Sequence, residues 1–257
     1  MVGGAAIVLA VACGDDSDPT STPNGASDTT EASAEPVVDP GDGGNYQPDI
    51  DPADFVETID NPYMPLTPGS TWIYEGVGDE GEMERIEVTV TADRRDVMGV
   101  STLVVRDTEY ADGELVEDTY DWFAQDREGN VWYFGEDTAE YEAGEVVTTE
   151  GSWEAGVDEA LPGIVMLADP RVGDAYRQEF YAGEAEDMGE VLEVGATRSI
   201  GLGEYRDVLV TEDWTPLEPE VIENKYYAPD VGMIAEEKTA GGSGSAELIE
   251  YTPAAGS

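Results

Sequence analysis

The sequence contains no histidine and only one cysteine, Cys13. A Ser-His-Asp triad needs an imidazole to move the proton, so hydrolases of this class are excluded. A Cys-His nucleophile is excluded for the same reason, and zinc sites made of histidine and cysteine lack their ligands. These absences remove several enzyme classes before any motif is considered.

Basic residues are also scarce, because 11 Lys and Arg stand against 59 Asp and Glu, for a formal net charge of −48. Lys225 and Lys238 are the only lysines, and there is no glycine-rich phosphate loop with its lysine. Phosphate binding requires clustered Lys and Arg side chains, so we expect no nucleic-acid partner. The simplest interpretation of the charge is a solvated, self-repelling surface that keeps the protein in solution.

Chemistry based on oxygen ligands and carboxyl groups is still open. Calcium binds between carboxylates and carbonyls, and glycosidases use pairs of carboxyl groups. The loop at residues 126–130 offers oxygens at alternate positions but lacks the full calcium-loop pattern, and Asp and Asn in a hairpin more often serve the turn itself. The many acids do not single out a pair, so we predict no catalytic residue, no metal and no cofactor.

Residues 1–12, MVGGAAIVLAVA, are small and apolar and end immediately before Cys13, as in an export signal. The four residues LAVA before Cys13 resemble the signal of bacterial lipoproteins. This resemblance implies a diacylglyceryl group on Cys13 and anchoring at the extracytoplasmic face of the bacterial membrane. An ordinary cleaved signal with an incidental cysteine is the alternative, whereas the run is too short to span ~30 Å of hydrocarbon.

Residues 13–54 consist largely of Ser, Thr, Asp, Glu, Pro, Gly and Ala. Such a segment cannot bury enough apolar surface to offset its chain entropy, so we predict a disordered acidic tether. Like charges extend a linker, which would hold the folded part away from the membrane. Residues 252–257 are predicted to be a disordered tail.

Residues 55–251 are predicted to form a single β domain. In residues 84–92, Ile86, Val88 and Val90 alternate with polar residues, which indicates a strand with one solvated face. Asp112-Gly113 and residues 126–130 are hairpin signals. The expected strands are residues 70–75, 84–92, 100–110, 114–125, 130–135, 140–142, 146–150, 175–181, 190–194, 205–214, 221–228, 233–239 and 246–251. A long connection at residues 151–172 separates the first seven of these strands from the last six. The pattern predicts an all-β antiparallel meander that forms a curved sheet or open half-barrel with little helix.

Two pseudo-repeats, about 68–137 and 172–239, align at one fixed offset. Pro68–Trp72 aligns with Val172–Tyr176, and Trp122–Asp126 aligns with Tyr226–Asp230. A repeat of this length predicts two similar sheet halves and not a solenoid of small units. The alternative is that two meanders simply share a turn rhythm.

Three motifs carry a family resemblance: PLTPGSTWIYEG at 65–76, DWFAQDREGNVWYFGED at 121–137 and YYAPDVG at 226–232. Together they resemble a family of uncharacterised bacterial cell-surface lipoproteins, which brings no assigned activity. The layout is distantly similar to the half-barrels of lipoprotein-localisation factors, which carry acyl chains in an apolar concavity.

Aromatic rings are the candidate ligand-binding residues, since they supply large contact area, although they also fill sheet cores. The candidates are Trp122, Tyr133, Trp214 and Tyr226. Successive residues on a strand face opposite sides, so Trp122 and Phe123 cannot share a face. We expect a non-enzymatic, exported and lipid-anchored module for binding or envelope assembly, with a small apolar ligand or an envelope protein as partner. The alternatives are a carboxylate-dependent glycan hydrolase and a calcium-binding surface protein.

Overall fold

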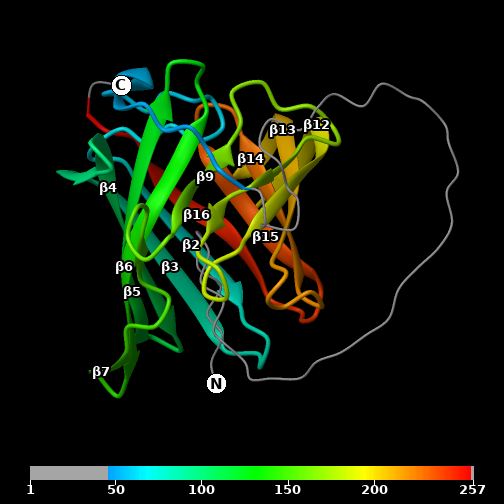
Figure 1. Ribbon diagram of the computed structural model, residues 1–257. Helices are drawn as coiled ribbons and strands as arrows, with labels where there is room; N and C mark the ends of the chain where they lie inside the picture. The colour runs from blue at the N-terminus through cyan, green and yellow to red at the C-terminus, as the bar shows by residue number, and fades with distance from the viewer. Residues whose placement is uncertain (1–45, 256–257) are drawn as a thin grey trace, which may run out of the picture.

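The computed structural model describes residues 46–255, which form one curved antiparallel sheet (Figure 1). The predicted signal segment, Cys13 and most of the predicted tether lie outside these residues. Helical structure in the described part is limited to one 3-10 turn, η1 (Pro52–Asp54). No helix among these residues is long and apolar enough to cross a membrane. The predicted all-β class with little helix is confirmed.

The sheet contains 16 strands, each paired antiparallel with its neighbours. The strands of the first half are β1 (Phe55–Val56), β2 (Thr71–Val77), β3 (Met83–Val97), β4 (Val100–Ala111), β5 (Glu114–Asp126), β6 (Val131–Glu142), β7 (Glu145–Thr148), β8 (Trp153–Glu154) and β9 (Leu161–Met166). Those of the second half are β10 (Ala175–Arg177), β11 (Glu179–Phe180), β12 (Met188–Ile200), β13 (Gly203–Trp214), β14 (Ile222–Ala228), β15 (Gly232–Ala240) and β16 (Ser245–Thr252).

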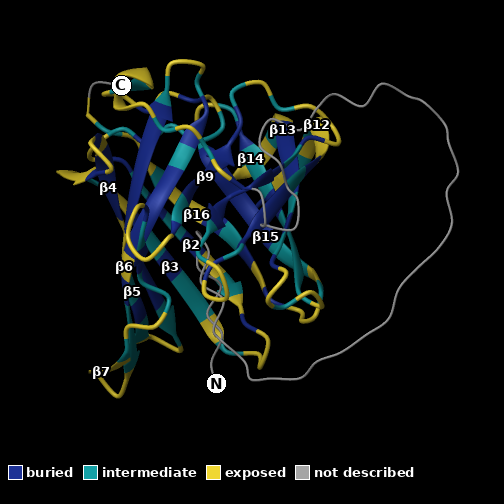
Figure 2. Ribbon diagram, viewed as in Figure 1, coloured by how far each residue is buried: buried dark blue, intermediate teal, exposed yellow. Residues whose placement is uncertain are grey.

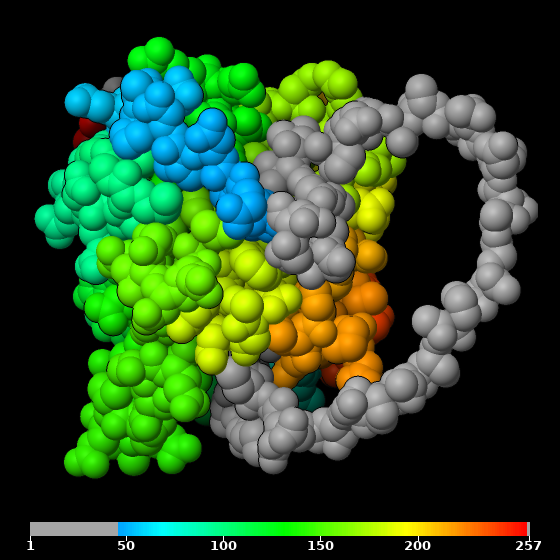
Figure 3. All heavy atoms as spheres, in the orientation of Figure 1, coloured from blue at the N-terminus to red at the C-terminus, as the bar shows by residue number. Residues whose placement is uncertain are grey.

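The order β10-β12-β13-β14-β15-β16-β2-β3-β4-β5-β6-β9-β11 curls into a nearly closed barrel. Its two ends meet at residues 175–180. Tyr176 in β10 lies opposite Gly189 in β12, whereas Glu179 in β11 lies opposite Pro162 in β9. In Figure 3 the yellow-green and yellow atoms of this region fill the front between the green first half and the orange second half. The sheet is therefore more closed than the open half-barrel that was one of the two predicted forms.

The interior face follows from alternation along the strands. In β3 the predicted stripe Ile86, Val88 and Val90 is buried, as the period of two indicates. Dark buried segments line the strands in Figure 2, and exposed residues gather at the turns. Most of the buried apolar side chains form one core cluster that draws on both halves of the chain.

The predicted connection at residues 151–172 is wrong, because it contains β8 and β9. Strand β9 pairs with β6 on one side and β11 on the other. The carbonyl of Pro162 in β9 accepts a hydrogen bond from the Tyr46 hydroxyl at 2.6 Å. Tyr46 is itself buried, so packing against the sheet includes residues N-terminal to Phe55, the predicted start of the β domain.

A capping segment, residues 61–66, covers one end of the sheet. The buried Asn61 side chain donates to the carbonyls of Gly129 and Leu167, at 2.9 and 3.0 Å. The carbonyl of Pro62 accepts from the backbone N–H of Asp230 at 2.8 Å. Gly129 lies in the β5–β6 hairpin and Asp230 in the β14–β15 hairpin, so the segment ties the two halves together over the interior.

Candidate functional site

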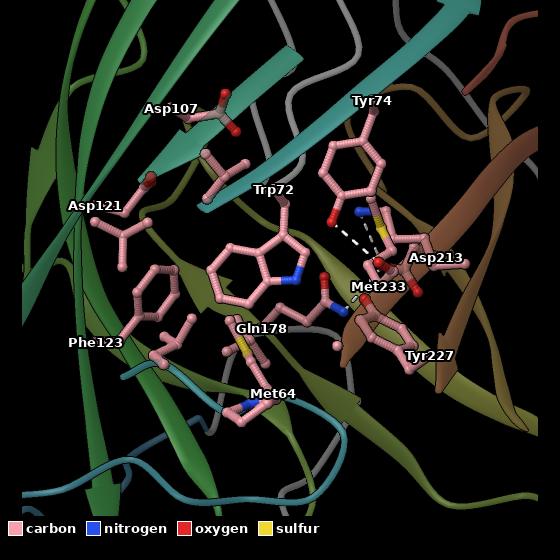
Figure 4. Close-up of a pocket in the computed structure, with 17 residues that line it drawn as sticks. Met64, Trp72, Tyr74, Asp107, Asp121, Phe123, Gln178, Asp213, Tyr227 and Met233 are labelled. Atoms are coloured by element: carbon pink, nitrogen blue, oxygen red, sulfur yellow. Dashed lines mark hydrogen bonds and ion pairs between the residues drawn. The ribbon is translucent and has the colours of Figure 1, made fainter. Parts of the chain in front are cut away.

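A cavity of about 70 Å³ lies inside the curved sheet (Figure 4). Its lining mixes apolar side chains with a few polar ones, an arrangement typical of small-molecule sites. The lining residues are Met64, Pro65, Leu66, Trp72, Tyr74, Val88, Val105, Asp107, Asp121, Phe123, Val165, Gln178, Asp213, Lys225, Tyr227, Gly232 and Met233.

The interior changes from apolar to acidic along the strand direction. In β4, Leu103, Val105, Asp107 and Glu109 share one face, and all four are buried. In β5 the same order runs from Phe123 through Asp121, since strands β4 and β5 are antiparallel. The capping segment closes the apolar end with Met64 and Leu66. A ligand in the cavity would meet apolar walls at one end and carboxyl groups at the other.

The side chain of Gln178 enters the cavity from the point where the two ends of the sheet meet. Only 3% of the surface of Gln178 is exposed to solvent. Its amide nitrogen donates to the Asp213 carboxylate at 3.2 Å, whereas its amide oxygen has no hydrogen-bond partner among the described residues. Figure 4 shows the side chain extending into the cavity below Trp72. A buried amide oxygen without a donor carries a desolvation cost that a ligand donor would remove.

Two glycines make room for Gln178. A Cβ on Gly163 would lie 2.3 Å from the carbonyl carbon and oxygen of Gln178, which are backbone atoms that cannot move aside. A Cβ on Gly189 would lie 2.8 Å from the Gln178 amide nitrogen and 2.9 Å from the Tyr176 ring. The strands on both sides of the closure therefore approach Gln178 closely because they lack side chains there.

Asp121 belongs to a buried group on β5 and β6. The Tyr133 hydroxyl lies 2.8 Å from both Asp121 Oδ1 and Glu136 Oε2. Burial raises the pKa of Asp121 to about 8, because it disfavours the charged carboxylate. Burial and the Asp121 charge also raise the pKa of Glu136 well above its ordinary value. The titratable groups near Asp121 are Asp107 on β4, Glu117 on β5, Tyr133 and Glu136 on β6, and Glu179 on β11.

Lys225 is the one cation that lines the cavity. Its ammonium forms a buried ion pair with Asp213 at 3.2 Å. Burial opposes its charge, but Asp213, Tyr227, Glu223 and Glu236 together outweigh this effect, and the pKa of Lys225 lies well above its ordinary value. Thr211 donates to the other Asp213 oxygen at 2.8 Å. The lysine is thus held as a charged partner of Asp213.

A second, more polar cleft of about 330 Å³ lies beside β8. Its lining includes the rings of Trp122, Trp153 and Tyr181, together with the acids Glu136 and Glu154. The Arg95 guanidinium lies 4.0 Å from the centre of the Trp122 ring and forms an ion pair with Glu154. Because Phe123 faces the interior cavity, its neighbour Trp122 faces the opposite side of β5, as alternation predicts.

The four aromatic residues predicted as ligand contacts do not form one site. Tyr133 is fully buried, stacks on Phe123 and holds Asp121, whereas Trp122 lines the cleft beside β8. Tyr226 is half-buried, with the Arg198 guanidinium 4.1 Å from its ring centre. Trp214 ends β13 opposite Ile222 and lines neither space.

The Asp126 carboxylate organises the β5–β6 turn. Its Oδ1 accepts from the backbone N–H groups of Glu128, Gly129 and Asn130, at 2.8 to 2.9 Å. Its Oδ2 accepts from the side chains of Asn130 and Trp132. Within residues 46–255, no group of three or more His, Cys, Asp or Glu side chains is placed to hold a metal ion. The oxygens of this loop serve the turn.

Sequence reasoning missed the polar residues of the cavity. One signal was available: Asp107 and Asp121 continue the apolar stripes of Val105 and Phe123 at a spacing of two, which places acids on an interior face. For Gln178 there was no local signal, because its place depends on the pairing of β10 and β11 with strands distant in sequence.

The fold and the cavity define a nearly closed antiparallel sheet with an apolar and acidic interior. No family model matches the chain, and no curated protein matches it. One similar solved structure is a predicted exported protein with a YmcC-like fold from Bacteroides fragilis NCTC 9343, at 14% identity over 74% of this chain and 99% of that one, with a TM-score of 0.44. Another is a predicted lipoprotein from Parabacteroides distasonis ATCC 8503, at 11% identity over 74% and 98%, with a TM-score of 0.40.

Proposed function

We propose that this protein is a binding module that holds a small ligand in the interior cavity of its sheet. The observation that carries the proposal is the cavity, in which apolar walls meet a few fixed polar groups. The polar groups come from both halves of the chain, since Asp107 and Asp121 lie on β4 and β5 and Asp213 and Lys225 lie on β13 and β14. A rigid site of this kind selects a ligand by shape and by hydrogen bonding.

We also propose that the module is exported and lipid-anchored through Cys13. Support comes from the apolar run at residues 1–12, which ends directly before the cysteine. The acidic segment that follows Cys13 would then act as a tether between the membrane and the sheet. Mass spectrometry of Cys13-containing peptides from the native host tests the anchor, and an unmodified Cys13 thiol contradicts it.

The binding proposal is tested by native mass spectrometry of the full chain, purified from its host under mild conditions. We expect a bound small molecule on the unaltered protein, and none on a Val165→Phe variant whose added ring fills the cavity. A Val172→Phe variant is the control, since Val172 is exposed and lies outside the cavity. An equal mass shift on all three proteins would place the ligand elsewhere and contradict the proposal.

A carboxylate-dependent glycan hydrolase is the second candidate, and the cleft beside β8 favours it. Aromatic rings line this cleft together with Glu136, whose pKa is raised by burial, as required of a general acid. Turnover of glycans that is lost in Glu136→Gln and kept in Glu142→Gln, an exposed acid of the same strand, would establish it. Absence of turnover by the full chain on a broad glycan panel would eliminate it.

A further inference from the structure

The polar groups of the interior cavity are matched unevenly, because several of its donors are occupied and one buried acceptor is not. The Trp72 indole donates to the Val231 carbonyl at 2.7 Å, and the Tyr74 hydroxyl donates to the Met233 carbonyl at 3.0 Å. The ammonium of Lys225 is paired with Asp213, as is the amide nitrogen of Gln178. The Gln178 amide oxygen has no donor within the described part of the chain. A ligand that completes this site must therefore bring hydrogen-bond donors.

The charged groups that line the cavity also favour a ligand with hydrogen-bond donors. Three carboxyl groups, those of Asp107, Asp121 and Asp213, line the cavity against the single ammonium of Lys225. Lys225 forms an ion pair with Asp213. A cation beside the Asp121 carboxyl group would favour its ionised form, whereas an anion there would oppose it. Asp107 and Asp121 lie on neighbouring strands and enter from one side, as Figure 4 shows. A positive group placed between Asp121 and Gln178 would have an acceptor from each residue.

The opposite end of the cavity is apolar. Met64 and Leu66 of the capping segment close it, and Phe123 and Met233 contribute side walls. A volume of about 70 Å³ has room for roughly five to seven non-hydrogen atoms, given 10–15 Å³ for each water-sized sphere. The ligand must therefore be short, with a donor-bearing head and a small hydrocarbon tail.

We propose that the interior cavity binds a small primary amine, with its ammonium group against Gln178 Oε1 and the Asp121 carboxylate and its tail between Trp72, Phe123 and Met64. This inference rests on the proposed function and specifies the ligand class of the same site. An ammonium supplies hydrogen-bond donors for Gln178 Oε1 and a positive charge beside the carboxyl group of Asp121. Hydrogen bonds between charged partners are about twice as strong as neutral ones.

Binding of an ammonium group would change the protonation of the Asp121 carboxyl group. In the empty cavity burial raises the pKa of Asp121 to about 8, so at pH 7 this carboxyl group is mainly protonated. A bound cation favours the ionised form and lowers that pKa, so the proton is released to solvent as the amine binds. We therefore expect amine affinity to rise between pH 6 and pH 9 and calorimetric heats at pH 7 to depend on the buffer.

The test uses three probes of equal length with different heads: n-butylamine, n-butanol and n-butyrate. Binding to the full chain is followed by NMR through the indole N–H of Trp72, which lines the cavity. We expect the amine to bind at least about tenfold more tightly than the alcohol, as charged hydrogen bonds imply, and butyrate not to bind. Equal binding of amine and alcohol would overturn the amine inference and leave the binding-module proposal standing. Failure of all three probes would overturn both.

Two near-isosteric variants locate the head group. Asp121→Asn removes the charge, and Gln178→Met removes the free acceptor, so each is expected to reduce amine affinity about tenfold or more while changing butanol binding little. Glu114→Gln, an exposed carboxyl group on the same strand as Asp121, is the control and should bind like the unaltered protein. If Asp121→Asn does not fold, Gln178→Met decides the matter alone. Unchanged amine affinity in the folded variants would contradict the assignment.

Discussion

At the scale of single residues, the unusual feature of this protein is the number of carboxyl groups on the inside of its sheet. Glu109, Asp121, Glu136 and Glu236 are all nearly inaccessible to solvent, and burial raises the pKa of each. A carboxyl group with a raised pKa holds a proton at a pH where an unfolded chain has released it. These groups therefore connect the stability of the fold to pH.

Whether stability rises or falls with pH depends on the pKa of each group in the unfolded and in the folded state. The pKa of Asp121 rises from 3.8 to about 8 on folding, and that of Glu236 rises from 4.5 to about 8. The folded state binds more protons between these values, so stability falls as pH increases from about 4 to about 8. We expect the melting temperature to decrease by at least about 3 °C between pH 5 and pH 8.

Asp121→Asn is predicted to weaken this pH dependence. An amide keeps an oxygen for the Tyr133 hydroxyl but does not ionise, so the variant should lose less stability than the unaltered protein between pH 5 and pH 8. Thermal unfolding at matched ionic strength measures the effect, with Glu114→Gln as the exposed control. Parallel curves for the unaltered protein and Asp121→Asn would show that Asp121 does not hold a proton in the folded state.

Asn61 is predicted to be the residue that secures the capping segment. Asn61→Ala leaves the carbonyls of Gly129 and Leu167 without their side-chain donor, so unfolding free energy should fall by about 2–4 kcal/mol. Tyr63→Phe removes only an exposed hydroxyl contact with the Asp207 carbonyl and should change stability by less than about 0.5 kcal/mol. Denaturant titration compares the two, and equal effects would argue against a specific role for Asn61.

At the scale of elements, the two halves of the sheet begin in the same way. The N–H of Gly69 donates to the Val90 carbonyl at 2.8 Å, and that of Gly173 donates to the Val191 carbonyl at 2.9 Å. Both glycines have positive φ, at 95° and 88°, which other residues rarely adopt. This parallel agrees with the prediction of two similar sheet halves from the two pseudo-repeats.

Equivalent glycines should respond equally to substitution. Gly69→Ala and Gly173→Ala are each predicted to cost about 1–2 kcal/mol, because an added Cβ meets no close atom at either site and only the backbone strain remains. Gly201→Ala, at a turn with open space and no positive φ, should be nearly neutral. Denaturant titration of the three variants measures this. A large cost at one of the first two positions and none at the other would argue against equivalence.

The sequence predicts elements well where a single strand carries its own pattern. The stripe in β3 and the turns at Asp112 and Asp126 fall where alternation and turn residues place them. Strand β9 was missed, because Pro162 and Gly163 interrupt its pattern and its partners β6 and β11 are set by the closure of the sheet. The cavity was not predicted, because the sequence of a chain with so many Asp and Glu residues does not distinguish the acids of the interior from those of the surface.

At the scale of the whole molecule, the sheet separates two environments. The whole chain has a formal net charge of −48, whereas the inside of the sheet holds carboxyl groups, among them Asp121 and Glu236, whose pKa burial raises. The capping segment covers one end of that interior, and strands β10 and β11 lie where the two edges of the sheet meet. The cavity and its acceptor-rich end depend on this closure, and so does the binding function that we propose.

The most direct measurement is a crystal structure of the full chain grown with and without n-butylamine. We expect density for the amine inside the sheet, with its tail beside Trp72 and Phe123 and its nitrogen within hydrogen-bond distance of Gln178 Oε1 and the Asp121 carboxylate. Butanol under the same conditions is expected to give weaker density. An interior that is the same with and without the amine, in a protein that keeps its fold, would contradict the central claim that the sheet encloses a ligand site.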